Sequence, residues 1–221
     1  MTFITELENT FAASSNAENA LAMAKYMKDL FPFFGIKTDE RRAVLKSVFK
    51  KHQAEIDSNA RTIAWELFLK KERELQYCGI EIIIKSLKNN YIIEDIVWIE
   101  KLLITNSWWD SVDTISKYIL GSYLEQFPTE IATVVQRFSN AENMWLNRSV
   151  ILFQLGYKSK TDFHLLQSLC LKHSHSNEFF IRKAIGWALR EYAKTDPEAV
   201  REFVLQSNLK PLSKKEALKN I

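Results

Sequence analysis

The stretch Trp145-Leu-Asn-Arg-Ser-Val150 decides the fold, because similar stretches recur along the chain at the spacing of a helix pair. Each copy begins with an aromatic or large apolar residue near the expected start of a long helix. The other copies are Leu75-Gln-Tyr-Cys-Gly-Ile80, Trp108-Trp-Asp-Ser-Val-Asp113 and Phe180-Ile-Arg-Lys-Ala-Ile185, at successive offsets of 33, 37 and 35 residues. A single helix pair cannot bury its apolar face, so units of this length stack side by side. The repeat predicts an all-α fold, a HEAT-like helical-repeat solenoid of stacked antiparallel helix pairs with a concave surface.

The rest of the chain agrees with a helical fold. Apolar residues recur at three- and four-residue spacing in almost every segment, and only 5 Gly and 4 Pro interrupt the pattern. Ser58, Thr129, Thr161 and Asp196 stand where helix N-caps are expected. The predicted helices cover residues 20–30, 40–49, 60–69, 72–88, 92–104, 109–125, 130–138, 144–157, 163–171, 178–194 and 197–205. No linker is evident, so we predict a single domain over residues 1–221.

Composition excludes several classes of protein. A chain with 47% hydrophobic and 26% charged residues is typical of a globular domain rather than a disordered one. It has no apolar run of 18 residues and no signal-peptide pattern at its start, so we expect a cytoplasmic protein. The sequence contains no metal-binding motif, phosphate-binding glycine loop or nucleophile elbow, so we expect no metal and no cofactor. Cys78 and Cys170 are interpreted as buried thiols.

The most unusual local feature is Ser107-Trp-Trp-Asp-Ser-Val-Asp113. Trp109 and Asp113 are four residues apart, so on a helix they share a face and place an aromatic wall beside a carboxylate. Asp110 points elsewhere and complements the helix dipole. The alternative interpretation is that Trp108 and Trp109 fill the core while Asp113 is an ordinary solvated acid.

A second feature is a stripe of mixed aromatic and basic residues near the end of the chain. Lys183, Trp187, Arg190 and Lys194 step by four, three and four residues, which places them on one helix face. Gly186 within this helix costs about 1 kcal/mol relative to Ala, which indicates that another helix or a ligand backbone approaches closely. Such a stripe suits a phosphodiester backbone, although it also suits a solvated face. The formal charge of +3 is too small to decide.

At these residues the chain resembles the AlkD-like DNA alkylation repair glycosylases. The resemblance covers nearly the whole chain and is carried by the stretches Ala24-Lys-Tyr-Met-Lys28, Phe34-Gly-Ile-Lys-Thr38 with Arg41-Arg42, Ser107 to Asp113, Ile151-Leu-Phe-Gln-Leu155, Phe179 to Lys194, and Pro211-Leu-Ser-Lys214. It implies helix pairs whose concave face binds duplex DNA. It also implies excision of cationic purines such as 3-methyladenine and 7-methylguanine.

The resemblance also assigns roles to individual residues. It implies a catalytic group of Trp109, Asp113 and Trp187, with Arg148 as a supporting DNA contact and Tyr26 as an aromatic near the lesion. The early helix at residues 20–30 is the element that inactive relatives lack. Gly156 departs from the pattern, because a relative carries a lysine there, and a lost cation would weaken DNA contact without removing the chemistry.

These expectations combine into a function and two alternatives. We expect a monomeric enzyme that hydrolyses the N-glycosidic bond of alkylated purines in duplex DNA, with Lys183, Arg190 and Lys194 as further DNA contacts and with no membrane partner. A non-catalytic DNA-binding paralogue on the same scaffold is the first alternative, and Asp113 argues against it. A helical-repeat module that binds other proteins is the second.

Overall fold

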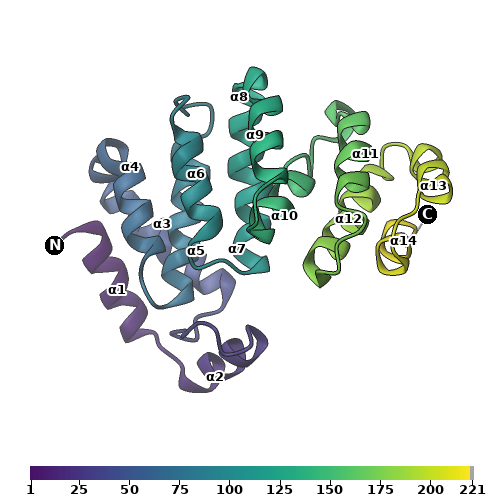
Figure 1. Cartoon of the computed structure of the whole chain (residues 1–221). Coiled ribbons are helices and arrows are strands. Elements are labelled where there is room, and N and C mark those ends of the chain that lie inside the picture. Colours follow the sequence, from purple (N-terminus) through teal and green to yellow (C-terminus); the bar gives the residue numbers. More distant parts are fainter. Residues whose placement is uncertain (220–221) are drawn as a thin grey trace. The chain divides into compact units, whose positions relative to one another are not determined.

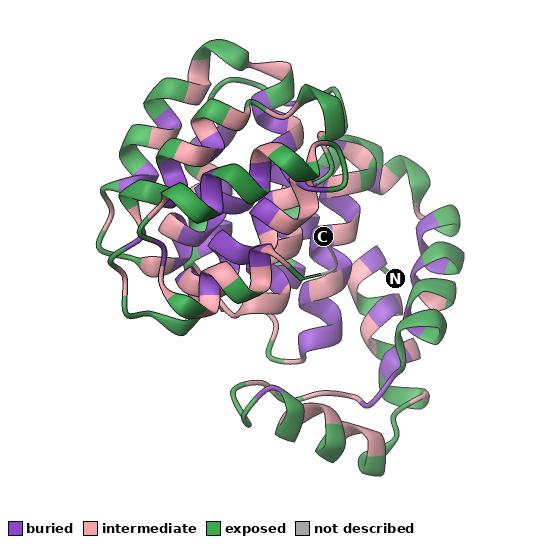
Figure 2. Ribbon diagram, turned by 90° about the vertical axis from the view of Figure 1, so that its right-hand side faces the viewer, coloured by how far each residue is buried: buried purple, intermediate pink, exposed green. Residues whose placement is uncertain are grey.

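The computed structural model describes residues 1–219, and every regular element in them is a helix (Figure 1). This confirms the all-α prediction. The chain divides into two compact units, an N-terminal unit of residues 1–90 and a C-terminal unit that starts at Tyr91. Most helices carry buried residues on one side and exposed residues on the other (Figure 2). The assignment of residues 1–221 to a single domain stays a prediction.

The N-terminal unit contains five helices, and their apolar spacing explains most of its core. Phe3, Leu7 and Phe11 recur every four residues and are fully buried, which packs the first helix against the third and fourth. The second helix has no buried residue. The helices are α1 (Phe3–Ala13), α2 (Ala17–Tyr26), α3 (Thr38–Lys51), α4 (Gln53–Phe68) and α5 (Arg73–Ser86).

A buried carboxylate fixes the segment that leads into α3. Glu74, in the first turn of α5, accepts hydrogen bonds from the backbone N–H groups of Phe34 (3.1 Å), Gly35 (2.9 Å) and Ile36 (3.1 Å). Gly35 adopts φ +86°, and a Cβ there would lie 2.1 Å from the carbonyl oxygen of Asn16. Only glycine fits this turn without displacing α2.

The C-terminal unit is a succession of helix pairs. Its elements are α6 (Asp95–Ile104), α7 (Trp109–Thr114), the π-helical η1 (Ile115–Leu120), α8 (Gly121–Gln126), the 3-10 turn η2 (Pro128–Glu130), α9 (Ile131–Ser139), α10 (Met144–Leu152), the 3-10 turn η3 (Lys158–Lys160), α11 (Phe163–Lys172), α12 (Phe179–Tyr192), α13 (Pro197–Gln206) and α14 (Pro211–Ala217). The segments α7, η1 and α8 follow one another without a break. A π-helical turn widens the helix by one residue and occurs often at functional sites.

The repeat seen in the sequence corresponds to helix starts in the structure. The second helix of successive pairs begins at Arg73, Trp109, Met144 and Phe179, at offsets of 36, 35 and 35 residues. The predicted stacking of helix pairs is therefore confirmed, and the structure adds α1 and α14, which the sequence analysis did not assign as helices.

Some predicted helix caps are correct and others are not. Asp196 accepts a hydrogen bond from the N–H of Ala199 and caps α13 as expected. Ser58 instead lies inside α4, where its hydroxyl donates to the carbonyl of Ala54. Thr129 lies within η2, and Asp162 rather than Thr161 caps α11. These hydroxyls bond to local carbonyls or lie one residue from the true cap, which composition does not distinguish.

Both cysteines are buried thiols, as predicted. Burial raises the pKa of Cys78 to about 12, and burial likewise raises the pKa of Cys170. Neither thiol is therefore a ready nucleophile near neutral pH.

Candidate active site

Three helices of the C-terminal unit meet at the side chain of Arg148. Its Nε donates to Oδ1 of Asp113 at 2.7 Å and its Nη2 donates to Oδ2 at 2.9 Å, so the guanidinium holds both carboxylate oxygens. Nη1 donates to the backbone carbonyl of Phe180. Asp113 comes from α7, Arg148 from α10 and Phe180 from α12, so one cation joins three successive repeats. Two parallel bonds fix the plane of the carboxylate as well as its position.

Burial dominates the electrostatics of this pair. The side chain of Arg148 is 5% exposed and that of Asp113 is 15% exposed. Burial raises the pKa of Asp113 above its ordinary value, the hydrogen bonds and charge of Arg148 oppose that rise, and the charge of Asp110 adds to it. Asp113 is therefore not the solvated helix acid of the alternative interpretation. Removing either partner would leave a buried charge uncompensated, which costs about 3–5 kcal/mol in known pairs.

An aromatic cluster supports the pair from one side. The rings of Trp108, Trp145 and Phe180 pack on one another, with centroid distances of 5.8 Å, 5.1 Å and 5.1 Å. These are the aromatic positions that recur in the sequence repeat. The Arg148 guanidinium carbon lies 5.8 Å from the Phe180 centroid. Trp108 is therefore a partly buried member of this packing rather than a fully buried core residue, and its buried indole N–H has no hydrogen-bond partner within residues 1–219.

Trp109 and Trp187 are partly buried, as are Trp108 and Phe180 of the cluster. Trp109 is the first residue of α7 and lies one helical turn before Asp113, on the same face. Trp187 lies seven residues after Phe180 on α12, which is about 10 Å along the helix axis and nearly the same face. It packs against the core formed by α10 to α14. That Trp109, Asp113 and Trp187 meet in one cleft stays a prediction.

The basic stripe of α12 is paired with carboxylates. Lys183 Nζ lies 2.9 Å from Oε1 of Glu216, and Arg190 Nη1 lies 2.8 Å from its Oε2. The hydrogen bond from Lys183 is the main cause that lowers the pKa of Glu216, and Arg190 adds to it. Lys194 pairs with Glu191 at 2.6 Å. Lys183 and Arg190 therefore hold α14 against α12, which the sequence analysis did not foresee because Glu216 lies in a different helix.

The same packing explains Gly186. A Cβ at this position would lie 2.4 Å from Cβ of Glu216 and 2.8 Å from the carbonyl oxygen of Ser213. Of the two approaches considered for this glycine, a neighbouring helix and a ligand backbone, the structure identifies the neighbouring helix α14.

The chain also matches known proteins. The family described as DNA alkylation repair enzyme matches residues 7–221. This chain belongs to the DNA alkylation repair enzyme family. A predicted DNA alkylation repair enzyme from Enterococcus faecalis is 35% identical, with a TM-score of 0.85 over 94% of this chain and 96% of that chain. The structure of smu.31 from Streptococcus mutans UA159 shares the fold, with 14% identity and a TM-score of 0.60 over 92% of this chain and 99% of that one. Among curated proteins, none matches this chain.

As a family member, the protein has a role in DNA alkylation repair, and its expected DNA contacts can be placed one by one. Arg148 is buried and occupied by Asp113 and Phe180, a geometry that favours positioning of the carboxylate over the expected contact with DNA. Lys183, Arg190 and Lys194 keep partly exposed side chains although each has an acidic partner. Tyr26 ends α2 in the N-terminal unit and is 68% exposed.

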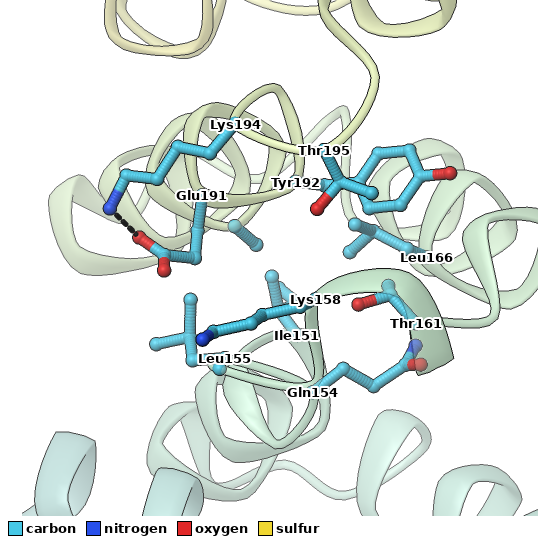
Figure 3. Close-up of a pocket in the computed structure, with 12 residues that line it drawn as sticks. Ile151, Gln154, Leu155, Lys158, Thr161, Leu166, Glu191, Tyr192, Lys194 and Thr195 are labelled. Carbon is cyan, nitrogen blue, oxygen red and sulfur yellow. Dashed lines mark hydrogen bonds and ion pairs between the residues drawn. The ribbon is translucent and has the colours of Figure 1, made fainter.

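A pocket of about 220 Å³ lies between the end of α10, α11 and the end of α12 (Figure 3). Ile151, Leu155 and Leu166 contribute apolar walls, and Lys158 faces the Glu191–Lys194 pair across the opening. The residues that line it include none of Trp109, Asp113 and Trp187.

Two further observations concern residues 1–219 as a whole. Histidine, cysteine and acidic side chains in this part of the chain form no cluster of three or more able to hold a metal ion. None of its helices has the length and apolar character needed to cross a membrane.

Proposed function

We propose that this family member is a DNA glycosylase that releases cationic alkylated purines, such as 3-methyladenine and 7-methylguanine, from duplex DNA. One observation carries the proposal. The Asp113 carboxylate is withdrawn from water, is gripped at both oxygens by a buried guanidinium, and lies one turn after Trp109. A fixed charge in a site of low polarity stabilises an opposite charge that develops during a reaction far better than a mobile surface acid does.

The chemistry matches this geometry. In a purine alkylated at N3 or N7, the bond between C1′ and the base breaks and its electron pair moves to the base, which leaves neutral without needing a general acid. The sugar becomes an oxocarbenium ion. We assign Asp113 to stabilise that cation and to orient the water whose oxygen bonds to C1′, with the water proton released to solvent. The faces of Trp109 and Trp187 are assigned to attract the same cation.

Arg148 acts on the reaction through Asp113. Its two hydrogen bonds hold the carboxylate plane, and its charge opposes the rise in pKa that burial causes, which favours the ionised form of Asp113 that the proposed chemistry needs. Its third bond, to the carbonyl of Phe180, ties that orientation to the helix that carries Trp187. Arg148 is thus a positioning residue in this proposal and not a phosphate contact.

The test is Asp113→Asn, which removes the charge and nearly preserves the shape. Single-turnover release of 7-methylguanine should slow by a hundred- to thousandfold, about 2.7–4 kcal/mol by analogy with removal of one preorganised electrostatic contact. Affinity for duplex should barely fall. Asp110→Asn is the matched control, since it removes the same charge three residues earlier on the helix and should change the rate far less. Circular dichroism of each variant verifies that it is folded.

Each outcome selects one function. An Asp113→Asn protein that releases base at the wild-type rate excludes Asp113 as the catalytic carboxylate. A wild-type protein that binds duplex but never releases base is the non-catalytic paralogue. A wild-type protein whose affinity for duplex is absent, or is indifferent to salt between roughly 50 and 200 mM, favours the protein-binding module.

A further inference from the structure

We propose that Lys117, on the π-helical turn after Asp113, is the cation that contacts the phosphate beside the sugar held at Asp113. The inference rests on the proposed function, because it names the partner of a residue at the same site. The first observation behind it is the spacing of three residues along the helix. Trp109, Asp113 and Lys117 follow one another at steps of four residues along the continuous segment α7–η1, so the three share one helix face.

The π-helical turn improves this alignment. Four residues exceed one turn of an α-helix, which has 3.6 residues per turn, so a side chain four positions on drifts around the axis. From Ile115 the helix widens, and the N–H of Gly121 donates to the carbonyl of Ser116, five residues earlier. The wider turn reduces the drift and keeps Lys117 more nearly in line with Asp113.

The place of the Lys117 side chain depends on Gly156. A Cβ at position 156 would lie 3.2 Å from Cε of Lys117 and 3.9 Å from its Nζ, and Gly156 adopts φ +92°. The lysine therefore passes beside a residue that has no side chain, in a turn that favours glycine. The Lys117 ammonium therefore places a positive charge beside Gly156, a residue that has no charged side chain of its own. The ammonium also lies 4.8 Å from the ring centroid of Tyr118.

The surrounding backbone holds this arrangement firmly. A Cβ at Gly121 would lie 2.6 Å from the carbonyl oxygen of Phe153, so the end of η1 packs directly on the segment that contains Gly156. The hydroxyl of Tyr157 donates to the carbonyl of Gly121 at 2.6 Å and ties the same two segments together. Lys117 therefore extends from a fixed base, although its own stem can rotate.

Lys117 differs in its ion pairing from the other basic residues considered for DNA contact. Arg148 is bound to Asp113, Lys183 and Arg190 are bound to Glu216, and Lys194 is bound to Glu191. In the part of the chain that the structure describes, no carboxylate lies within ion-pair distance of Lys117. Its only ionic or ring contact there is the one with Tyr118.

The site needs such a cation. The pair of Asp113 with Arg148 has no net charge, and a carboxylate that faces a deoxyribose repels the phosphates on either side of that sugar. Each DNA strand carries a phosphate about every 3.4 Å along the axis, so a sugar at Asp113 has one within reach of a lysine one helical turn away. An unpaired ammonium at that place offsets the repulsion and draws the strand against the carboxylate.

The experiment compares Lys117→Met with the wild-type protein in duplex binding from roughly 50 to 200 mM salt. Loss of one phosphate contact should lower the slope of log affinity against log salt by about 0.9. Lys117→Arg should restore the slope. Lys101→Met is the matched control, because Lys101 is also a lysine of the C-terminal unit without an ion pair in the described residues but lies on α6. Its slope should equal that of the wild type.

The outcomes are decisive for Lys117 itself. An unchanged slope in Lys117→Met overturns the proposal, as do equal losses in Lys117→Met and Lys101→Met or a wild-type protein that does not bind duplex. Base release by saturating enzyme is measured in parallel. A wild-type protein that binds but does not release base removes the proposed glycosylase activity, while the slope of Lys117→Met still decides whether Lys117 contacts the strand.

Discussion

Each of the two units withdraws a carboxylate from solvent near the start of a long helix. The two carboxylates accept hydrogen bonds from different kinds of donor. Glu74 in the N-terminal unit is fully buried and accepts from three successive backbone N–H groups. Asp113 in the C-terminal unit keeps a side chain 15% exposed and is held by one side chain, Arg148. A carboxylate bound by backbone can only fix the chain, whereas one held from behind by a guanidinium can still face a ligand.

The largest effect on folding should follow from Glu74→Ala. Three buried or partly buried N–H groups would lose their acceptor, and each such donor costs roughly 1–3 kcal/mol, so we expect the free energy of unfolding to fall by about 3–9 kcal/mol. Urea denaturation measures the change. At a temperature where the variant is still folded, the rate of base release should equal that of the wild type. A large loss of rate in folded Glu74→Ala protein would mean that Glu74, like Asp113, supports the reaction and not only the fold.

The Asp113–Arg148 pair is best probed by a double-mutant cycle. Arg148→Met should destabilise the fold by about 3–5 kcal/mol, because it leaves a buried carboxylate without its counter-charge. The double variant Asp113→Asn with Arg148→Met should recover part of this stability but none of the catalytic rate. Denaturation and single-turnover assays on all four proteins separate the two effects. Additive losses in stability would mean that the pair is not coupled as the distances indicate.

A smaller loss should follow from Gly186→Ala. The added Cβ would meet Glu216 and the carbonyl of Ser213, so α14 must move away from α12, at a cost of about 1–3 kcal/mol. The Lys183 and Arg190 pairs with Glu216 would loosen with it. Thermal denaturation gives the cost, and Gly79→Ala, which would press on the Ala64 carbonyl at 2.6 Å, provides the corresponding test in the N-terminal unit. A neutral Gly186→Ala would contradict the close approach of α14.

The smallest effects concern pH. Rising pH should reduce the stability that His52 contributes in the N-terminal unit, whereas falling pH should reduce the rate of base release at Asp113 in the C-terminal unit. Hydrogen bonds that the His52 ring donates to Glu6 and Glu55 raise the pKa of His52 in the N-terminal unit. Its contribution to stability is therefore complete below about pH 6.5, the ordinary histidine value, and is lost as pH rises through the raised pKa. Melting temperatures of the wild type and His52→Gln should converge with rising pH.

In the C-terminal unit the group to follow is Asp113, whose burial raises its pKa. Base release requires the ionised form in our proposal, so the rate should fall as pH is lowered through that raised value, after subtraction of spontaneous base loss. Asp113→Asn should lack this acid limb. A pH profile shared by wild type and mutant would assign the titration to another group.

The sequence predicts the helices and the recurring aromatic positions. It does not predict which charged residues pair across different helices. Helix starts and the aromatic positions Trp108, Trp145 and Phe180 follow from periodicity, because apolar spacing and repeat length are local properties. The partnership of Asp113 with Arg148 joins residues 35 positions apart, and Glu216 reaches α12 from 26 residues beyond Arg190. Pairing of charges across helices depends on how the repeats stack, and a stripe of lysines looks the same whether it meets solvent, DNA or a neighbouring carboxylate.

The aromatic cluster limits how far these repeats can be treated as interchangeable modules. In most helical-repeat proteins each repeat contacts only its neighbours, and repeats can be inserted or removed at modest cost. Here Trp108, Trp145 and Phe180 come from three successive pairs and touch one another, and Arg148 bonds to the helices on both sides of its own. A repeat added between α8 and α9 would lengthen the array but separate Trp108 from Phe180. The three pairs from α6 to α12 therefore form a single indivisible segment of the chain.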